Sequence, residues 1–336
     1  TSVLHKYLWN VNRVFSGIKP SGEVQLGNYL GALQNWVSMQ DTSDAVYCVV
    51  DLHALTVPHD ADELRSSTLS LAQMLMAVGL DTERCILFVQ SHVQEHAECA
   101  WLMECTAAFG ELRRMTQFKD KSTGNEFVSA GLFTYPALQA ADILLYDTNQ
   151  VPVGEDQRQH IELTRDIATR FNSRFGDTFT LPEAVIPPSG ARVMDLQHPD
   201  RKMSKSEESP QGTILILDPP EVIEKKVKRA VTDSDDEVFF DVEKKPGISN
   251  LLSILGAATG KTPKEACDGI TRYGDLKNAT AEAVIELLRP VQEKYYTLAD
   301  DPAETSRLIA KGAEKAREIA STTLSRARDN IGLLKQ

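Results

Sequence analysis

The sequence predicts an α/β fold in which a Rossmann-type, doubly wound parallel sheet carries a helical insertion and is followed by a C-terminal α-helical domain. Short apolar runs alternate with helix-like stretches in the first half of the chain, as in nucleotide-binding α/β units. After about residue 206 the periodicity is mostly helical. A length of 336 residues indicates roughly two domains.

The elements of the first half follow in order. A strand is expected at residues 14–18, and a glycine-rich turn and a helix follow it. Buried strands are expected at residues 45–57 and 85–89, and the helix between them is expected to end at Gly79. This βαβαβ order predicts that ligands bind at the C-terminal ends of the strands.

The helical pattern of residues 93–146 predicts an insertion into the α/β domain. A strand at residues 151–153 then precedes a helix that begins near Asp156. A long amphipathic helix is expected to start at Pro302, with Asp301 as its N-cap. The expected organisation is an N-terminal extension (1–13), a Rossmann catalytic domain (14–210) with its helical insertion (about 93–146) and a lysine-containing loop (202–206), and a helical domain (211–336).

Composition excludes several classes of protein. The chain has 48 acidic and 36 basic residues and a formal net charge of −12, which argues against a general nucleic-acid coat but not against a local basic groove. The five cysteines form no Cys-x-x-Cys pair, and we expect them to be reduced. The apolar runs are far shorter than the ~18 residues of a membrane span. These features predict a cytoplasmic enzyme, or one of the mitochondrial matrix if the source is eukaryotic.

Two segments carry residue types that suit phosphate chemistry. Residues 15–31 place four glycines around the first strand-to-helix turn, where backbone N–H groups can approach anionic oxygens. Residues 201–206 place Lys202 and Lys205 three positions apart beside hydroxyl groups, which suits a leaving pyrophosphate. Taken alone, glycines are common in loops, and the second segment is typical of a solvated basic loop.

Together these segments resemble the His-Ile-Gly-His and KMSKS signatures of class I aminoacyl-tRNA synthetases. The resemblance becomes specific through four further segments in the same order: Val50-Asp-Leu-His-Ala54, Met115-Thr-Gln-Phe-Lys-Asp-Lys121, Thr134-Tyr-Pro-Ala-Leu-Gln-Ala-Ala-Asp-Ile-Leu-Leu-Tyr146 and Val151-Pro-Val-Gly-Glu-Asp-Gln157. In this order they are similar to the bacterial-type tryptophanyl-tRNA synthetases, from about Arg13 to the C-terminus. The resemblance implies a Rossmann catalytic domain with a connective insertion, a helical anticodon-binding domain and a homodimer.

The resemblance also implies a reaction. Enzymes of this family activate L-tryptophan with ATP to tryptophanyl-adenylate and pyrophosphate, and then transfer tryptophan to the terminal adenosine of tRNA(Trp). Mg²⁺ would bridge the phosphates, held mainly by ATP oxygens and water, so no protein metal site is expected. Neither DNA nor a membrane is an expected partner. Two alternatives stay open, a tyrosyl-tRNA synthetase-like enzyme and an amino-acid-binding paralogue that charges no tRNA.

Residue by residue, the resemblance implies three groups of site residues. The expected catalytic cations are Lys121, Lys202 and Lys205. The expected ATP-binding residues are Lys19, Ser21, Gln25, Gly27, Asn28, Gly154, Asp156, Met203 and Ser204. The expected tryptophan-binding residues are Phe15, Gly17, His53, Tyr135, Gln139, Asp142, Val151, Val153 and Gln157.

The helix that carries Asp142 illustrates the physical reasoning. Pro136 suits the first turn of a helix, and spacings of four and three place Tyr135, Gln139 and Asp142 along one face. A carboxylate there can accept the N–H of an indole, whereas a phenylalanine ligand would leave that carboxylate unpaired. The resemblance implies that Asp142 is the indole partner and that Tyr135 and Gln157 hold the ammonium group of the substrate.

Other candidates keep a structural alternative. His53 follows an apolar strand, where doubly wound sheets place ligands, but it also fits a core or capping histidine. Asp156 follows a strand and opens a helix, so it fits a ribose contact and equally a plain N-cap. The basic cluster at Lys225, Lys226, Lys228 and Arg229 fits a solvated helix face as well as contact with the tRNA backbone.

Three positions depart from the common family pattern. Gln25 stands where the first signature usually begins with His, and Asn28 replaces the closing His. Lys19 stands where these enzymes usually carry Gln, so a cation there predicts a change in ATP binding or inhibitor sensitivity. Gln139 stands where several relatives have Met, which predicts a more polar wall of the indole pocket.

Overall fold

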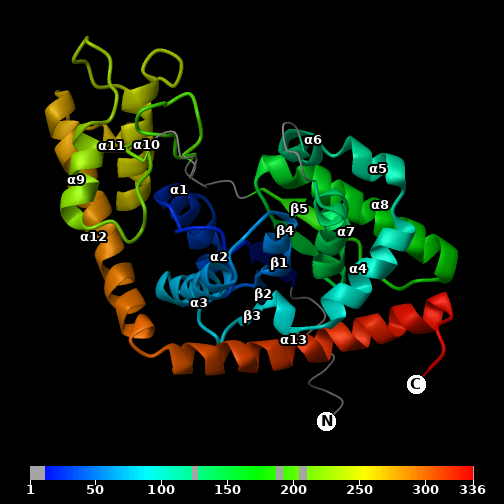
Figure 1. Cartoon of the computed structure of the whole chain (residues 1–336). Helices are drawn as coiled ribbons and strands as arrows, with labels where there is room; N and C mark the ends of the chain where they lie inside the picture. The colour runs from blue at the N-terminus through cyan, green and yellow to red at the C-terminus, as the bar shows by residue number, and fades with distance from the viewer. Residues whose placement is uncertain (1–11, 123–127, 187–191, 204–209, 336) are drawn as a thin grey trace.

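The computed structural model describes residues 12–122, 128–186, 192–203 and 210–335. At its centre lies a parallel sheet of five strands in the order β3-β2-β1-β4-β5 (Figure 1). The strands are β1 (Arg13–Ile18), β2 (Asp44–Val49), β3 (Ile86–Val89), β4 (Gln150–Pro152) and β5 (Glu183–Val185). The predicted doubly wound α/β class is confirmed, and the chain reverses its direction of travel through the sheet between β1 and β4.

Both faces of the sheet are buried because its side chains alternate between two cores. In β2, Tyr47 and Val49 pack into the core shared with α3, α10 and α12. Val46 and Cys48 point the other way, into the core shared with α4, α7 and α8. Such two-sided burial is typical of parallel sheets with helices on both faces.

The helices of the first half connect the strands and build the insertion. The first of them is continuous through α1 (Leu26–Asn28), η2 (Tyr29–Leu33) and α2 (Gln34–Met39). The others are η3 (Leu52–Thr56), α3 (Ala61–Ala77), η4 (Gln90–His92), α4 (Glu95–Thr106), α5 (Phe109–Arg114), α6 (Thr116–Ser122), α7 (Ala130–Leu144), η5 (Glu155–Gln157) and α8 (Arg158–Phe175). The second half contributes α9 (Pro220–Lys228), α10 (Pro246–Thr259), α11 (Pro263–Ala266), α12 (Tyr273–Ala299) and α13 (Pro302–Ile331).

Two local predictions need correction. The strand expected at 45–57 ends at Val49, and the chain continues as the short helix η3. Pro136 does not lie in the first turn of a helix, because α7 already begins at Ala130 behind the N-cap Ser129. A proline inside a helix removes one backbone hydrogen bond, and here the flanking turns of α7 are buried against the insertion and the sheet.

The second half separates into two parts in space. Helices α9 to α12 stand together at one side of the sheet, whereas α13 runs back along the base of the molecule under β3 and α4 (Figure 1). The small residues Ala313, Ala316 and Ala320 of α13 belong to the same core as Phe88 of β3. Within the predicted helical domain of residues 211–336, α13 thus packs against the α/β part. The reason is that a stripe of alanines lets a helix approach a sheet edge closely.

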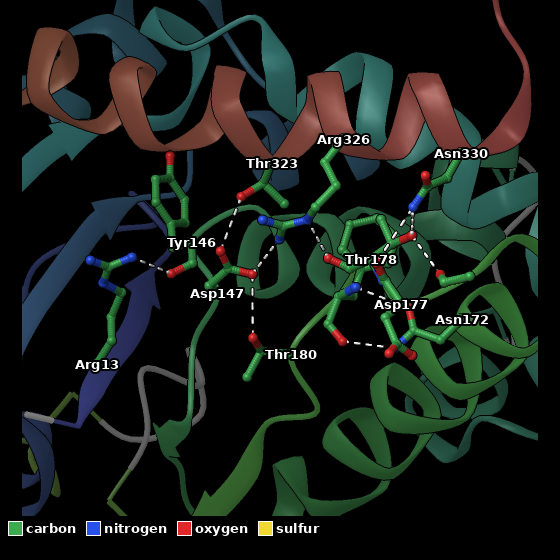
Figure 2. A network of polar contacts seen from close by, with 12 residues as sticks. Arg13, Tyr146, Asp147, Asn172, Asp177, Thr178, Thr180, Thr323, Arg326 and Asn330 are labelled. Carbon is green, nitrogen blue, oxygen red and sulfur yellow. Dashed lines mark hydrogen bonds and ion pairs between the residues drawn. The ribbon is translucent and has the colours of Figure 1, made fainter. Parts of the chain in front are cut away.

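The last turns of α13 are fastened to the loops that follow α7 and α8. Arg326 contacts the Asp147 carboxylate at 2.6 Å and donates from Nε to the Thr178 carbonyl at 2.7 Å. Asn330 donates to the Thr178 hydroxyl at 2.7 Å. Figure 2 shows these side chains reaching down from α13 onto the two loops. The C-terminal helix is therefore an integral wall of the α/β part.

Two further expectations concern the ends and the surface of the chain. The expected extension over 1–13 lies almost wholly outside the described residues, and Arg13 already belongs to β1. Among the described residues, none of the helices combines the length and the apolar character that crossing a bilayer requires.

Candidate functional site

A cavity of about 300 Å³ opens where β1, β2 and β4 end. The strands β1 and β4 pair at Val14 and Gln150, and the residues beyond this pair form part of the wall. The cavity therefore lies at the switch point of the sheet, where doubly wound folds bind ligands.

The lining gathers residues that are far apart in the sequence. It includes every residue predicted for tryptophan, namely Phe15, Gly17, His53, Tyr135, Gln139, Asp142, Val151, Val153 and Gln157. Lys19, which was predicted for ATP, lines the same cavity. The remaining lining residues are Ser16, Val50, Thr56, Gln117 and Ile143.

Asp142 is the buried carboxylate of this cavity, with an exposed fraction of 1%. Its Oδ2 accepts from His53 Nε2 at 2.7 Å, and its Oδ1 accepts from Gln90 Nε2 and from His96 Nδ1, each at 2.6 Å. Burial alone would raise the pKa of Asp142, but the adjacent His53 and His96 lower that pKa to about 2. The cavity thus presents a stable negative charge in a wall of mixed apolar and polar side chains.

Tyr135 forms a second polar point of the wall. Its hydroxyl lies 2.9 Å from Nε2 of His160 and donates to Gln117 Oε1 at 3.3 Å. Burial raises the pKa of Tyr135 to about 12, so the phenol stays neutral. Its ring meets the ring of His53 edge to face, at 6.2 Å between centroids. Tyr135 and His53 therefore orient each other across the cavity.

The first signature forms the start of helix α1. Gln25 is the N-cap residue, and its side-chain oxygen accepts from the N–H of Gly27 at 3.0 Å. The side-chain nitrogen of Gln25 donates to the carbonyl of Met203 at 2.6 Å. Gln25 and Met203 are both buried, so this bond joins the two signature segments inside the protein. Gly27 and Asn28 follow in the first helical turn, with Asn28 half-buried.

The second signature is described only in its first part. Lys202 is exposed and forms an isolated antiparallel bridge with Met194. The side chain of Asn250 on α10 accepts from the N–H of Met194 and donates to its carbonyl, each at 2.8 Å. The segment is therefore braced by the helical part of the chain. Ser204, Lys205 and the side chain of Lys121 lie outside the described residues.

The remaining ATP candidates lie around the mouth of the site. Ser21 is exposed, and its N–H donates to the carbonyl of Lys19 at 2.8 Å. Gly154 and Asp156 are exposed at η5, after β4. Asp156 Oδ2 accepts from Gln157 Nε2 at 2.8 Å, while no side-chain cap is formed at the start of η5. Asp156 is therefore not an N-cap, and it holds the amide of the cavity residue Gln157.

Comparison with known proteins places this chain in a family. A family model for tRNA synthetases class I (W and Y) matches residues 10–289. Tryptophan–tRNA ligase 2 of Streptomyces avermitilis is 55% identical over 327 residues, covering 96% of this chain and 97% of that protein. The chain belongs to the tryptophan–tRNA ligase family.

Solved structures of this family share the fold over nearly the whole chain. Tryptophanyl-tRNA synthetase from Mycoplasma pneumoniae has a TM-score of 0.90 and 38% identity, over 96% of this chain and 98% of that one. The enzyme from Campylobacter jejuni, complexed with ADP and tryptophan, has a TM-score of 0.81 and 34% identity, over 96% and 100%. The resemblance inferred from the motifs is confirmed.

Two residues that contact Asp142 were missed from the sequence. Gln90 follows β3 directly, so the rule that ligands gather at strand ends provided a signal for it. His96 lies on α4 and gave no local signal, because its contact with Asp142 joins positions 46 residues apart. Both side chains are fully buried.

Two of the four cations in the basic cluster of Lys225, Lys226, Lys228 and Arg229 form ion pairs within the protein. Lys226 is buried and pairs with Asp218 at 2.6 Å, and Lys228 pairs with Glu224 one turn earlier. Lys225 and Arg229 are exposed near the end of α9. Any contact of this cluster with RNA therefore falls mainly to these two cations.

Proposed function

We propose that this protein activates L-tryptophan with ATP and transfers the tryptophanyl group to the terminal adenosine of tRNA(Trp). The observation that carries the proposal is the buried Asp142 carboxylate on a cavity that also has apolar walls, from Phe15, Val151 and Val153. A ligand that donates an N–H to a buried carboxylate binds more tightly than a ligand that leaves the carboxylate without a partner. The ring N–H of tryptophan meets this requirement, whereas phenylalanine has no side-chain donor.

The remaining lining residues fit the other parts of the amino acid. Phe15, Val151 and Val153 supply apolar surface for the indole, with Gln139 as a polar part of the wall. Tyr135 and Gln157 provide oxygens for the ammonium group. The bound tryptophan of the Campylobacter jejuni relative supports placing the amino acid here.

ATP is proposed to lie beside this cavity, over the start of α1. Gly27 and Asn28 lie in the first turn of α1, and Lys19 and Lys202 offer cations for the phosphates, joined by Lys121 and Lys205. The ADP of the Campylobacter jejuni relative supports a nucleotide site. Mg²⁺ enters with ATP as part of the substrate. Within the described ranges, no group of three or more His, Cys, Asp or Glu side chains could hold a metal ion.

The reaction follows in two steps. The tryptophan carboxylate attacks the α-phosphorus of ATP, forming tryptophanyl-adenylate and releasing pyrophosphate. The attacking carboxylate is already ionised, so positioning and charge stabilisation by the lysines do the work without a general base. A terminal ribose hydroxyl of the tRNA, the 2′-hydroxyl by analogy with class I enzymes, then attacks the acyl carbon and AMP leaves.

The amino acid specificity is tested by ATP–pyrophosphate exchange with tryptophan and with tyrosine, measured side by side. We expect faster exchange with tryptophan, in line with the tryptophan–tRNA ligases that this chain resembles over nearly its whole length. Faster exchange with tyrosine would instead identify a tyrosyl-tRNA synthetase-like enzyme.

The second step is tested with a matched tRNA(Trp) transcript. We expect the transcript to be esterified with tryptophan and a tRNA(Tyr) transcript to stay uncharged. Normal exchange with no charging of either transcript would identify the amino-acid-binding paralogue.

A homodimer in the cytoplasm is proposed for the working enzyme. The exposed aromatic residues Trp101 and Phe109, with exposed fractions of 64% and 68%, and the neighbouring exposed Cys105 lie on α4 and α5. A second copy is the proposed cover for this apolar surface. Light scattering should give the dimer mass for the wild type and a lower mass for Trp101→Glu with Phe109→Glu. A monomeric wild type would contradict the proposal.

A further inference from the structure

The carboxylate of Asp142 is held from behind by two fully buried side chains. Gln90 and His96 both have exposed fractions of 0%, and both donate to Oδ1. Gln90 is itself held, because its Oε1 accepts the N–H of Leu52 at 3.1 Å. Neither Gln90 nor His96 lines the cavity, so neither is placed to touch a ligand there.

His96 is fixed in turn by Tyr146. A carboxylate can only accept, so His96 Nδ1 carries the proton of the bond to Asp142. In the neutral ring, Nε2 then accepts from the hydroxyl of Tyr146 at 2.8 Å. Tyr146 is anchored as well, by stacking on Phe15 at 5.4 Å and by the bond from Arg13 to its carbonyl at 2.9 Å (Figure 2).

The two oxygens of Asp142 therefore differ in what they can still accept. A carboxylate oxygen has about two lone pairs available for hydrogen bonds. Oδ1 already accepts two hydrogen bonds, whereas Oδ2 accepts one, from His53, which lines the cavity. The oxygen with remaining acceptor capacity is thus the one on the side of the cavity.

We propose that His96, backed by Tyr146 and assisted by Gln90, is a positioning residue that fixes the Asp142 carboxylate so that Oδ2 accepts the ring N–H of tryptophan. The proposal rests on the proposed tryptophan site and adds the residues that set its specificity. Without His96 the carboxylate would lose one of its two rear hydrogen bonds and could rotate about its terminal torsion. A misdirected carboxylate oxygen would still allow the aromatic ring to bind. It would mainly reduce the preference for tryptophan over ligands that lack the ring N–H.

The decisive measurement compares tryptophan with its analogue in which sulfur replaces the indole N–H. The analogue fills the same space and cannot donate to Asp142, so the ratio of the two kcat/KM values in pyrophosphate exchange reports the N–H contact alone. We expect His96→Leu to reduce this preference for tryptophan about tenfold, mainly through KM for tryptophan. KM for ATP is expected to stay within about twofold, because ATP does not meet this carboxylate.

Conservative variants distinguish positioning from general packing. In His96→Asn the amide nitrogen takes the place of Nδ1, so we expect the preference to return to within about threefold of the wild type. In His96→Gln the amide reaches toward Tyr146 instead, and the preference should stay low. Met103→Val, a core change on the same helix α4, is the matched control and should affect both substrates equally.

Two further variants carry the test if His96→Leu does not fold. At nearly constant volume, Gln90→Met removes the hydrogen bonds to Asp142 and from Leu52, and Tyr146→Phe removes the one to His96; both should lower the preference for tryptophan. A preference unchanged in all the variants that fold, or an equal loss with tryptophan and with the sulfur analogue, would overturn the proposal.

Asp142→Asn separates this proposal from the function on which it rests. In Asp142→Asn the rear donors Gln90 and His96 should take the amide oxygen, so that an amide NH2 group, which cannot accept, lies toward the cavity. If Asp142→Asn leaves the preference unchanged, the proposed tryptophan site is wrong. If Asp142→Asn abolishes the preference while the Gln90, His96 and Tyr146 variants keep it, the site stands and the positioning role is refuted.

Discussion

Asp142 stays charged in the interior because three donors surround it. Its pKa of about 2 in the folded protein lies below the ordinary value of about 3.9, owing to His53 and His96 acting against the cost of burial. A carboxyl group whose pKa is lower when folded stabilises the protein above its unfolded pKa. This contribution is lost as the pH falls through the folded value.

The first prediction is therefore an acid-dependent loss of stability. The free energy of unfolding should fall more steeply between pH 5 and pH 2 for the wild type than for Asp142→Asn, by on the order of 2 kcal/mol. Urea unfolding at a series of pH values measures it. Parallel pH profiles for the two proteins would contradict the assignment of the low pKa to Asp142.

Lys19 brings a cation to the lining of the cavity. If it faces ATP phosphates, Lys19→Gln should raise KM for ATP about two- to fivefold, since a partly solvated ion pair contributes up to about 1 kcal/mol. Lys19→Arg keeps the charge and serves as the control. Unchanged ATP kinetics together with unchanged inhibitor response in Lys19→Gln would remove this residue from the ATP site.

At the scale of elements, α13 depends on one glycine where it crosses β3. A Cβ added at Gly312 would lie 1.9 Å from the carbonyl oxygen of Leu87, which is backbone and cannot turn aside. The helix would have to move away from the sheet, together with the alanines that follow on its buried face. The close approach of α13 to β3 therefore requires a residue without a Cβ at position 312.

Gly312→Ala should consequently destabilise the protein by about 1–3 kcal/mol in urea unfolding. The matched control is Gly274→Ala on α12, where an added Cβ meets nothing within 4 Å. That change should be neutral or stabilising by up to about 1 kcal/mol, because alanine favours helix. Similar effects of the two substitutions would show that α13 is free to adjust.

Helix α7 shows how one element serves both fold and site. Its spacing brings Tyr135, Gln139 and Asp142 to the cavity, as the sequence predicts. Its end leads into Tyr146 and Asp147, which connect it to β1 and to α13 (Figure 2). The wall of the site is therefore anchored at the base of the molecule.

At the scale of the whole molecule, the net charge of −12 leaves few cations for RNA. The exposed Lys225 and Arg229 on α9 are the proposed contacts from the basic cluster. If two or three phosphates are contacted, doubling the salt concentration should weaken tRNA binding about three- to fourfold.

Filter binding or KM for tRNA at several salt concentrations measures this dependence, and pyrophosphate exchange without tRNA should change less. Lys225→Gln with Arg229→Gln should flatten the salt dependence, whereas Lys335→Gln, beyond the end of α13, should leave it unchanged. A slope unaffected by the double substitution would place the tRNA contacts elsewhere.

The sequence alone determined the parallel sheet, the family and many of the residues that line the cavity. Period-two burial and helical spacing are local, so β1 and β3 were expected within one residue of their observed starts. The ordered motifs identified the family because each motif lies within one short segment, as at residues 134–146 and 151–157.

Only the tertiary structure decided what surrounds those residues. It joined Gln25 to Met203 by a buried hydrogen bond, paired Lys226 with Asp218, and placed α13 against β3. It also placed Gln90 and His96 behind Asp142. Each of these is a contact between segments distant in the chain, and periodicity and spacing carry information about neighbours along the sequence rather than partners across the core.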